Sequence, residues 1–253
     1  MNTYTTSLLI SSLATGTIIA ASTNHWLMAW AGLELNTLAI LPLLTKAHTP
    51  RSTESAVKYF LTQTAASTVL LAASTTNALS TGQWDITQLT TKPALIMLTL
   101  SLMMKLGVAP LHAWLPEVMQ GTSLKMALTL ATWQKLAPFA LLFTLSHLMH
   151  TPTLLTLALL STILGGWGGL NQTQLRKLMA FSSIAHLGWV ISMMTLNTHL
   201  ALATLALYIS MTTTMFSTLM PTNMKSLKDT TTTWPTGPTT MLIMLLTLIS
   251  LGG

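Results

Sequence analysis

Long apolar stretches alternate with short polar or proline-containing segments along the whole chain. The stretches recur roughly every 25 to 30 residues, and each is close to the ~20 residues that a helix needs to cross a bilayer. This pattern predicts an all-α fold, a polytopic bundle of about nine transmembrane helices in one membrane domain spanning residues 1–253. The expected helices are 3–22, 25–45, 54–75, 93–110, 122–147, 152–170, 175–196, 199–220 and 238–253.

The composition supports a membrane protein and excludes several other classes. Hydrophobic residues make up 51% of the chain and charged residues only 6%, whereas an ordinary soluble domain has about 25% charged residues. The net charge is +6, but the basic residues are scattered without forming a stripe, which argues against nucleic-acid binding. The absence of cysteine excludes disulfides, thiolate zinc sites and cysteine-held iron–sulfur clusters from this chain.

The basic residues of the loops predict an orientation. They follow the even-numbered expected helices, whereas the odd loops hold only Lys92, beside Asp85. By the positive-inside rule, the N-terminus and the even loops face the cytoplasm or the mitochondrial matrix. The first apolar stretch lacks the basic start and cleavage site of a signal peptide, so we expect it to be a span of the mature chain. The residues of the even loops are Lys46, Arg51, Lys58, Arg176, Lys177, Lys225 and Lys228.

A broken helix is expected near residues 105–116, where Gly107, Pro110 and Pro116 interrupt an apolar stretch. Proline removes an amide donor and clashes with the preceding turn. Irregular backbone at membrane depth is tolerated where protein or water satisfies it, and it often marks an ion pathway. The alternative is that Pro110 simply ends a helix at the membrane surface, and the sequence leaves both open. The last apolar run stops at Gly253 without a charged or aromatic flank, so we expect the chain to end inside a span.

Three charged residues fall near the middle of expected spans. At a rise of ~1.5 Å per residue, Glu34 lies about 13 Å along its helix, and Lys105 and Lys135 each lie about 18 Å along theirs. A charged side chain at the centre of a helix costs roughly 2.5 to 3.5 kcal/mol on insertion scales. A buried lysine exchanges its proton readily when a carboxylate is near, so the three residues suggest a proton pathway. Static salt bridges, or lysines that reach to the membrane surface, are the alternative.

Two histidines are further candidates for the proton pathway. His186 lies about 14 Å into the seventh expected span, and an imidazole passes protons near neutral pH. His112 follows Pro110 and either leads protons inward or lies at the headgroups. The other histidines lie at the edges of expected loops without the spacing of a metal site, so no metal or haem is assigned. Gly165 and Gly169 have the spacing of close helix packing.

Five segments carry a specific resemblance from about residue 24 to residue 253. The chain resembles the antiporter-like membrane subunits of animal mitochondrial respiratory complex I, NADH–ubiquinone oxidoreductase. The wider family is similar to Mrp-type cation/proton antiporters, which have inverted five-helix repeats with one broken helix in each. The segments are WAGLELN (30–36), MKLGVAPLHAWLPE (104–117), WQKLAP (133–138), GGLNQTQLRK (168–177) and FSSIAHLGW (181–189).

The resemblance implies a role for each matching residue. Glu34 matches the family's pathway glutamate, Lys105 its lysine beside the first broken helix, and Lys135 its central lysine. The family's exit lysine and its remaining C-terminal helices correspond to positions beyond residue 253. Ser123 stands where the family pattern leads us to expect a proline. The resemblance also implies a multi-pass protein of the mitochondrial inner membrane with its N-terminus on the matrix side, in contact with other membrane-arm subunits.

The implied function is proton translocation driven by electron transfer in other subunits. NADH, FMN, iron–sulfur clusters and ubiquinone would be handled by those subunits, and this chain would bind none of them. Two alternatives remain open at this point. One is a subunit of an Mrp-type Na⁺/H⁺ antiporter, and the other is a structural membrane spacer whose charges form static salt bridges.

Overall fold

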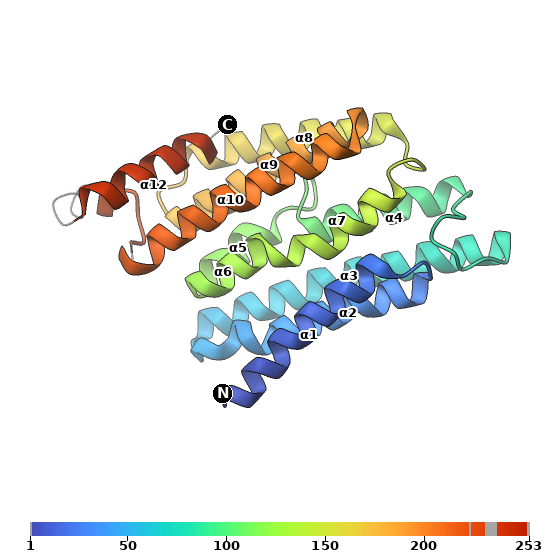
Figure 1. Cartoon of the computed structure of the whole chain (residues 1–253), viewed down its shortest axis with the longest axis horizontal. Helices are drawn as coiled ribbons and strands as arrows, with labels where there is room; N and C mark the ends of the chain where they lie inside the picture. The colour runs from blue at the N-terminus through green and yellow to red at the C-terminus, as the bar shows by residue number, and fades with distance from the viewer. Residues whose placement is uncertain (1, 223, 231–236, 252–253) are drawn as a thin grey trace. The chain divides into compact units, whose positions relative to one another are not determined.

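The computed structural model describes residues 2–222, 224–230 and 237–251 of the chain. This described part consists of α-helices and connecting segments, with no β-strand. The prediction of an all-α fold is therefore confirmed. The helices are α1 (Thr3–Ser22), α2 (Trp26–Leu44), α3 (Pro50–Thr81), α4 (Lys92–Leu106), α5 (Trp114–Gly121), α6 (Leu124–Ala131), α7 (Trp133–Leu145), α8 (Thr151–Leu170), α9 (Leu175–Leu196), α10 (Thr198–Thr222) and α12 (Pro238–Leu251), as Figure 1 shows.

Six helical stretches of the described chain are long and apolar enough to cross a membrane. The remaining helices differ in length or polarity, because α3 has 32 residues with many polar side chains and α4 and α12 have 15 and 14 residues. The polytopic character is confirmed, and the count of nine spans stays a prediction. The six stretches are Thr3–Ser22, Trp26–Ala47, Leu124–Leu145, Thr151–Leu170, Leu175–Leu196 and Thr198–Thr222.

The chain forms two compact units. The first unit consists of Met1–Gly107 and Gln134–His150, so it contains α1 to α4 and nearly all of α7. The second unit consists of Val108–Trp133 and Thr151–Gly253, and it contains α5, α6, α8, α9, α10 and α12. Each unit therefore combines segments that are separated in the sequence.

Glycines bring α1 and α2 together in the first unit (Figure 1). A Cβ atom added at Gly32 would lie 2.8 Å from the backbone nitrogen of Ala20, and one added at Gly16 would lie 2.9 Å from the carbonyl oxygen of Gly32. Real Cβ atoms do not approach backbone atoms so closely, so both positions require glycine. This contact fixes the part of α2 that carries Glu34, two residues after Gly32.

In the second unit, a glycine likewise allows α8 and α9 to pack closely. A Cβ atom at Gly165 would lie 2.6 Å from the nitrogen of Ala185. At Gly169 the nearest atom, in Phe181, would be 3.7 Å away, which is an ordinary contact. Close packing is therefore confirmed for Gly165, whereas Gly169 leaves room for a larger side chain.

The expected helix 93–110 ends earlier than its hydrophobicity suggests. Gly107 has a φ of +78°, a left-handed conformation that ends α4 at Leu106. The backbone stays non-helical through Pro110 to Ala113, and the chain passes from the first unit to the second between Gly107 and Val108. Pro116 differs from the expectation, since it lies within the first turn of α5, where a missing amide donor is tolerated.

The expected helix 122–147 is interrupted at Thr132, between α6 and α7. Thr132 has φ −114° and ψ −70°, outside ideal helical geometry. Pro138 lies inside α7 and cannot donate a hydrogen bond to the carbonyl four residues earlier. Proline is a common cause of such irregularities, and the hydropathy of the segment does not reveal it.

Candidate functional site: a hydroxyl-linked carboxylate and lysine

The three charged residues expected at mid-depth all belong to the first unit. Glu34 lies on α2 and is partly buried, Lys105 lies in the last turn of α4 and is 5% exposed, and Lys135 lies on α7 and is 2% exposed. Lysine is almost never this buried unless a partner satisfies its ammonium group. The structure therefore has to supply polar contacts for these side chains inside the helix bundle.

A serine of α3 connects Glu34 to Lys105. The Lys105 ammonium donates a hydrogen bond of 2.7 Å from Nζ to the Ser67 hydroxyl oxygen. The Ser67 hydroxyl in turn donates a hydrogen bond of 2.7 Å to Oε2 of Glu34. Both contacts have the short distance of charge-assisted hydrogen bonds. Three side chains from α2, α3 and α4 thus form one continuous hydrogen-bonded row.

Glu34 and Lys105 do not form a direct ion pair. No salt bridge with an N···O distance up to 4.0 Å joins Glu34 to Lys105 in the described part of the chain, whereas Glu54 and Lys58, near the start of α3, form one. The Glu34 carboxylate still acts electrostatically on Lys105 and on Tyr59. The static salt bridge considered from the sequence is thus replaced by two charges that share a hydroxyl group.

The backbone around Lys105 is held by the same helix that carries Ser67. Gly107 ends α4 and its N–H donates to the carbonyls of Met103 and Met104, which leaves the carbonyl of Lys105 to a partner outside the helix. The side chain of Gln63, one turn before Ser67 on α3, donates from Nε2 to the carbonyl oxygen of Lys105 at 3.5 Å. Helix α3 therefore contacts both the backbone and the ammonium group of Lys105.

Helix α3 carries a buried polar stripe that was not anticipated from the sequence. Its members are separated by about one helical turn, or by two turns between Ser67 and Ser74, so they lie on one face of α3. Ser and Thr are frequent throughout α3, so composition does not reveal this stripe. The signal that could have revealed it is the helical spacing of the polar residues. The buried polar residues of the stripe are Ser52, Ser55, Tyr59, Gln63, Ser67, Ser74 and Asn77.

Lys135 lies on α7, a helix other than the three that carry this row of hydrogen bonds. Its helix α7 contacts α2 through the neighbouring residue, since Gln134 donates from Nε2 to the carbonyl oxygen of Asn36 at 3.5 Å. Asn36 follows Glu34 by two residues and is 2% exposed. Helix α7 is thus placed against the same segment of α2 that carries Glu34, within the first unit.

The two candidate histidines belong to the second unit. His186 on α9 is partly buried, and its Nδ1 lies 2.8 Å from the carbonyl oxygen of Ser182, which requires a proton on Nδ1. Its ring lies 5.7 Å from the ring of Tyr208. His112 lies in the non-helical segment after Pro110, and its buried Nδ1 makes no hydrogen bond to the described residues. Both histidines thus belong to the second unit, whereas Glu34, Ser67 and Lys105 belong to the first.

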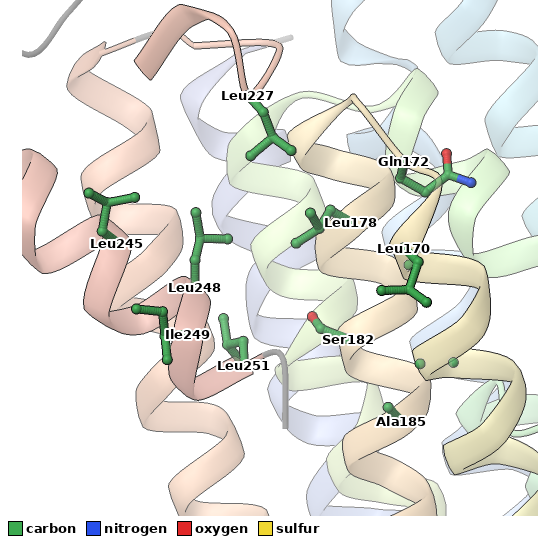
Figure 2. A pocket seen from close by; sticks show the side chains of 13 residues that line it. Leu170, Gln172, Leu178, Ser182, Ala185, Leu227, Leu245, Leu248, Ile249 and Leu251 are labelled. Atoms are coloured by element: carbon green, nitrogen blue, oxygen red, sulfur yellow. The ribbon is translucent and has the colours of Figure 1, made fainter. Parts of the chain in front are cut away.

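The structure has a pocket in the second unit and an open groove in the first. A pocket of about 400 Å³ in the second unit lies among α8, α9 and α12, and Figure 2 shows its mostly aliphatic lining, with Ser182 and Gln172 as the polar exceptions. It holds no titratable side chain and offers no proton chemistry. An open groove of about 540 Å³ in the first unit runs along α1 and α2 and is lined by Glu34, Trp30 and Ser12 among apolar residues. Glu34 thus borders an open groove on one side of α2.

Within the described residues, no group of three or more His, Asp or Glu side chains is arranged to hold a metal ion. A carboxylate, a hydroxyl and an ammonium in hydrogen-bonded sequence can exchange protons without other reactants.

The chain is similar to known proteins in sequence. Residues 23–253 match the family model described as NADH:quinone oxidoreductase/Mrp antiporter, TM. The whole chain is 52% identical over 253 residues to NADH-ubiquinone oxidoreductase chain 2 of Xenopus laevis, and equally so to that of Latimeria chalumnae. In both cases the alignment covers 73% of the relative.

The chain is also similar in fold to chains of solved structures. A chain of respiratory complex I from Thermus thermophilus, determined with bound aureothin, superposes with a TM-score of 0.81 at 30% identity, over 87% of this chain and 52% of the other. A chain of an Mrp complex from a Dietzia species superposes with a TM-score of 0.71 at 21% identity, over 83% of this chain and 25% of the other, and this likeness shows the fold alone. The present chain thus spans about half of the Thermus chain that it resembles.

Proposed function

Because the chain belongs to the NADH:quinone oxidoreductase/Mrp antiporter membrane family, we propose that it moves protons across the mitochondrial inner membrane through Glu34, Lys105 and Lys135. It does so as a membrane subunit of the H⁺-translocating NADH–ubiquinone oxidoreductase, complex I. Its partners are the other subunits of that complex, above all the neighbouring membrane-arm subunits. NADH, FMN, iron–sulfur clusters and ubiquinone are bound by those other subunits.

The observation that supports this function is the row formed by Glu34, Ser67 and Lys105. Ionisable groups are expensive inside a membrane and are found there mainly where they bind ions or relay protons. A purely structural role would be served by a direct ion pair or by apolar residues, which are often at least as stabilising. Two ionisable groups of opposite type, linked through a hydroxyl and not in direct contact, are suited to changing their protonation states.

The charge of Glu34 controls the proton affinity of Lys105 in this proposal. Two titratable groups in such proximity bind protons as a coupled pair, so a change at one alters the occupancy of the other. Glu34 faces the open groove on α1 and α2, through which a neighbouring subunit can change its charge. The signal then passes to Lys105 and onward to Lys135, which lies on the helix placed against α2. His112 and His186 are proposed to extend the path within the second unit.

The proposed orientation places the N-terminus on the matrix side. Lys46 and Arg51 lie where α2 gives way to α3, Arg176 and Lys177 lie in the first turn of α9 after α8, and Lys225 and Lys228 follow α10. Positive charge is retained on the side from which membrane proteins insert. This orientation also decides which end of the proposed proton path lies toward the matrix.

The experiment that tests the function measures protons moved per electron by assembled complex I in vesicles. Lys105→Met and Lys135→Met remove each ammonium group and keep the side chain long and apolar. Both variants should lower the proton-to-electron ratio while electrons still pass from NADH to quinone. A surface control is Lys125→Met on α6, whose side chain is exposed and outside the proposed path. Unchanged ratios in both path variants would refute the proposed proton relay.

A second candidate is Na⁺/H⁺ exchange of the Mrp type, which the likeness to an Mrp complex chain brings into consideration. The site argues against it as the first choice, because Glu34, Ser67 and Lys105 present one carboxylate beside an ammonium group. An ammonium group repels Na⁺, which prefers a cage of oxygen ligands. A proton flux in vesicles that rises with sodium concentration would favour the antiporter.

A further inference from the structure

We propose that the Ser67 hydroxyl is the group through which a proton passes between Lys105 and Glu34. This inference deepens the proposed function, on which it rests, by assigning the transfer step to a residue outside the set of charged groups. Ser67 lies on α3, a helix that contributes no charged residue to the path.

The first argument is the direction of the two hydrogen bonds. Lys105 Nζ donates to Ser67 Oγ at 2.7 Å, and the same oxygen donates to Glu34 Oε2 at 2.7 Å. Both bonds therefore run in one direction, from the acid that holds the proton to the base that receives it. A hydroxyl is suited to this position because it is a donor and an acceptor at once.

The second argument is that Ser67 behaves unlike the other buried serines of the described chain. Serine in a helix usually donates its hydroxyl to a carbonyl three or four residues earlier, which hides the group from lipid. The other buried serines each do so with the carbonyl three residues earlier. Ser67 makes no such bond and turns its hydroxyl to two side chains of other helices. The others are Ser52, Ser55, Ser74, Ser101, Ser161, Ser182 and Ser183.

The third argument is that direct transfer lacks the required contact. Glu34 and Lys105 are beyond the 4.0 Å at which an ion pair is recognised. Proton transfer requires donor and acceptor within about 2.6 to 3.2 Å, or one intermediate group between them. Ser67 is 2% exposed and is fixed on the rigid helix α3, so it is an intermediate group held in place.

The transfer step is balanced without any further reactant. As Lys105 loses a proton, its Nζ–H bond breaks and a new O–H bond forms at Ser67. At the same time the original Ser67 O–H bond breaks and an O–H bond forms on the Glu34 carboxylate. The products are a neutral lysine, an unchanged serine and a neutral glutamic acid. The reverse step returns the proton to Lys105.

The test uses full-length chains in assembled complex I and again measures the proton-to-electron ratio in vesicles. Ser67→Ala removes the hydroxyl and should lower the ratio to the value of Lys105→Met. Ser67→Thr keeps a hydroxyl and should retain a ratio well above that of the alanine variant. The matched control is Ser74→Ala on the same helix, since Ser74 is 1% exposed and bonds only to the carbonyl of Leu71. This control should leave the ratio unchanged.

A second readout separates proton transfer from mere packing. Coupled turnover in D₂O relative to H₂O should show a solvent isotope effect in the wild type and in Ser67→Thr, and a changed effect in Ser67→Ala. If Ser67→Ala does not assemble, Ser67→Cys provides a side chain of similar size with a weak donor, and its ratio should be lower than that of Ser67→Thr.

The outcomes distinguish this inference from the function on which it rests. A wild-type ratio in Ser67→Ala together with a reduced ratio in Lys105→Met would overturn the serine bridge and leave the relay standing. Wild-type ratios in both variants would overturn the relay as well. Equal losses in Ser67→Ala and Ser67→Thr would show that packing at residue 67 matters and would overturn the role of the hydroxyl.

Discussion

The phenol of Tyr208 on α10 donates a hydrogen bond of 2.9 Å to the carbonyl oxygen of Ala131, the last residue of α6. Both residues are buried in the second unit. The carbonyls at the end of a helix lack intrahelical partners, and a buried carbonyl without a partner is destabilising. Tyr208 therefore supports the interruption of the helix at Thr132, with the ring of His186 packed against it.

Tyr208→Phe should destabilise the protein by removing this bond, together with the side-chain hydrogen bond to Ser183, without changing the packing of the ring. Leaving a buried carbonyl unsatisfied costs about 1–3 kcal/mol. The measurement is the thermal stability of the purified complex, with Tyr4→Phe as control, because Tyr4 is 81% exposed. Equal stability of the two variants would show that the bond to Ala131 contributes little.

Gly32→Ala should disturb the contact between α1 and α2. Its Cβ would lie 2.8 Å from the nitrogen of Ala20, so the helices must separate or shift. Overpacking of this kind costs typically about 1–3 kcal/mol, and here it would also displace Glu34, two residues away. The variant should assemble less well than Gly166→Ala, since nothing lies within 4 Å of a Cβ at Gly166. Similar assembly of both variants would contradict the tight packing.

Asp229 predicts a local dependence on pH in the segment after α10. Its carboxylate accepts hydrogen bonds of 2.9 Å from the backbone N–H groups of Ser226 and Lys225 and one of 2.8 Å from the Ser226 hydroxyl. These bonds, that of the Ser226 N–H first, hold the pKa of Asp229 below its ordinary value. The stabilisation is therefore present above the ordinary aspartate pKa of about 3.9 and is lost as the pH falls through the native value.

Amide hydrogen exchange of this segment checks the prediction, with wild type and Asp229→Asn compared at the same pH. At neutral pH the wild type should protect the Leu227 amide, which donates to Thr173 at 3.0 Å, better than the variant does. The difference should shrink as the pH falls through the depressed pKa. A difference that stays constant to low pH would mean that the charge of Asp229 is not its source.

The orientation can be measured directly because the chain has no native cysteine. Single cysteines at Lys225, after α10, and at Gln83, after α3, place one reactive thiol in an exposed position on each proposed side. A membrane-impermeant maleimide should label Lys225→Cys from the matrix side only and Gln83→Cys from the opposite side only. The reverse pattern would invert the proposed topology.

Much of the helical architecture follows from hydrophobicity. The apolar runs have the length of membrane helices, and breaks in the pattern mark most of the helix ends. Local backbone chemistry limits such predictions, because the left-handed Gly107 ends α4 before its apolar run is complete. Pro138 similarly accompanies an interruption inside an apolar segment. These features depend on single residues within stretches whose average hydropathy hardly changes.

The charged residues of the site could be predicted from the sequence. The hydrogen bonds through Ser67 that connect two of them could not. Glu34, Lys105 and Lys135 are conspicuous because charges are rare in spans, and the structure brings all three into the first unit. Ser67 is inconspicuous because a serine hydroxyl satisfies itself equally well on its own helix. The hydrogen-bond partner of the Ser67 hydroxyl depends on how α2, α3 and α4 pack together. This packing involves residues that are distant in the sequence.

The most direct measurement of the central claim is the proton-to-electron ratio of assembled complex I carrying Glu34→Gln, Lys105→Met or both changes together. If the two residues act in one proton path, each single change lowers the ratio and the double change lowers it no further, since residues that act as a unit are not additive. If their charges serve only as structural counterparts, removing both together restores the wild-type ratio. The account predicts a double variant as deficient as either single one, and a double variant with the wild-type ratio would contradict it.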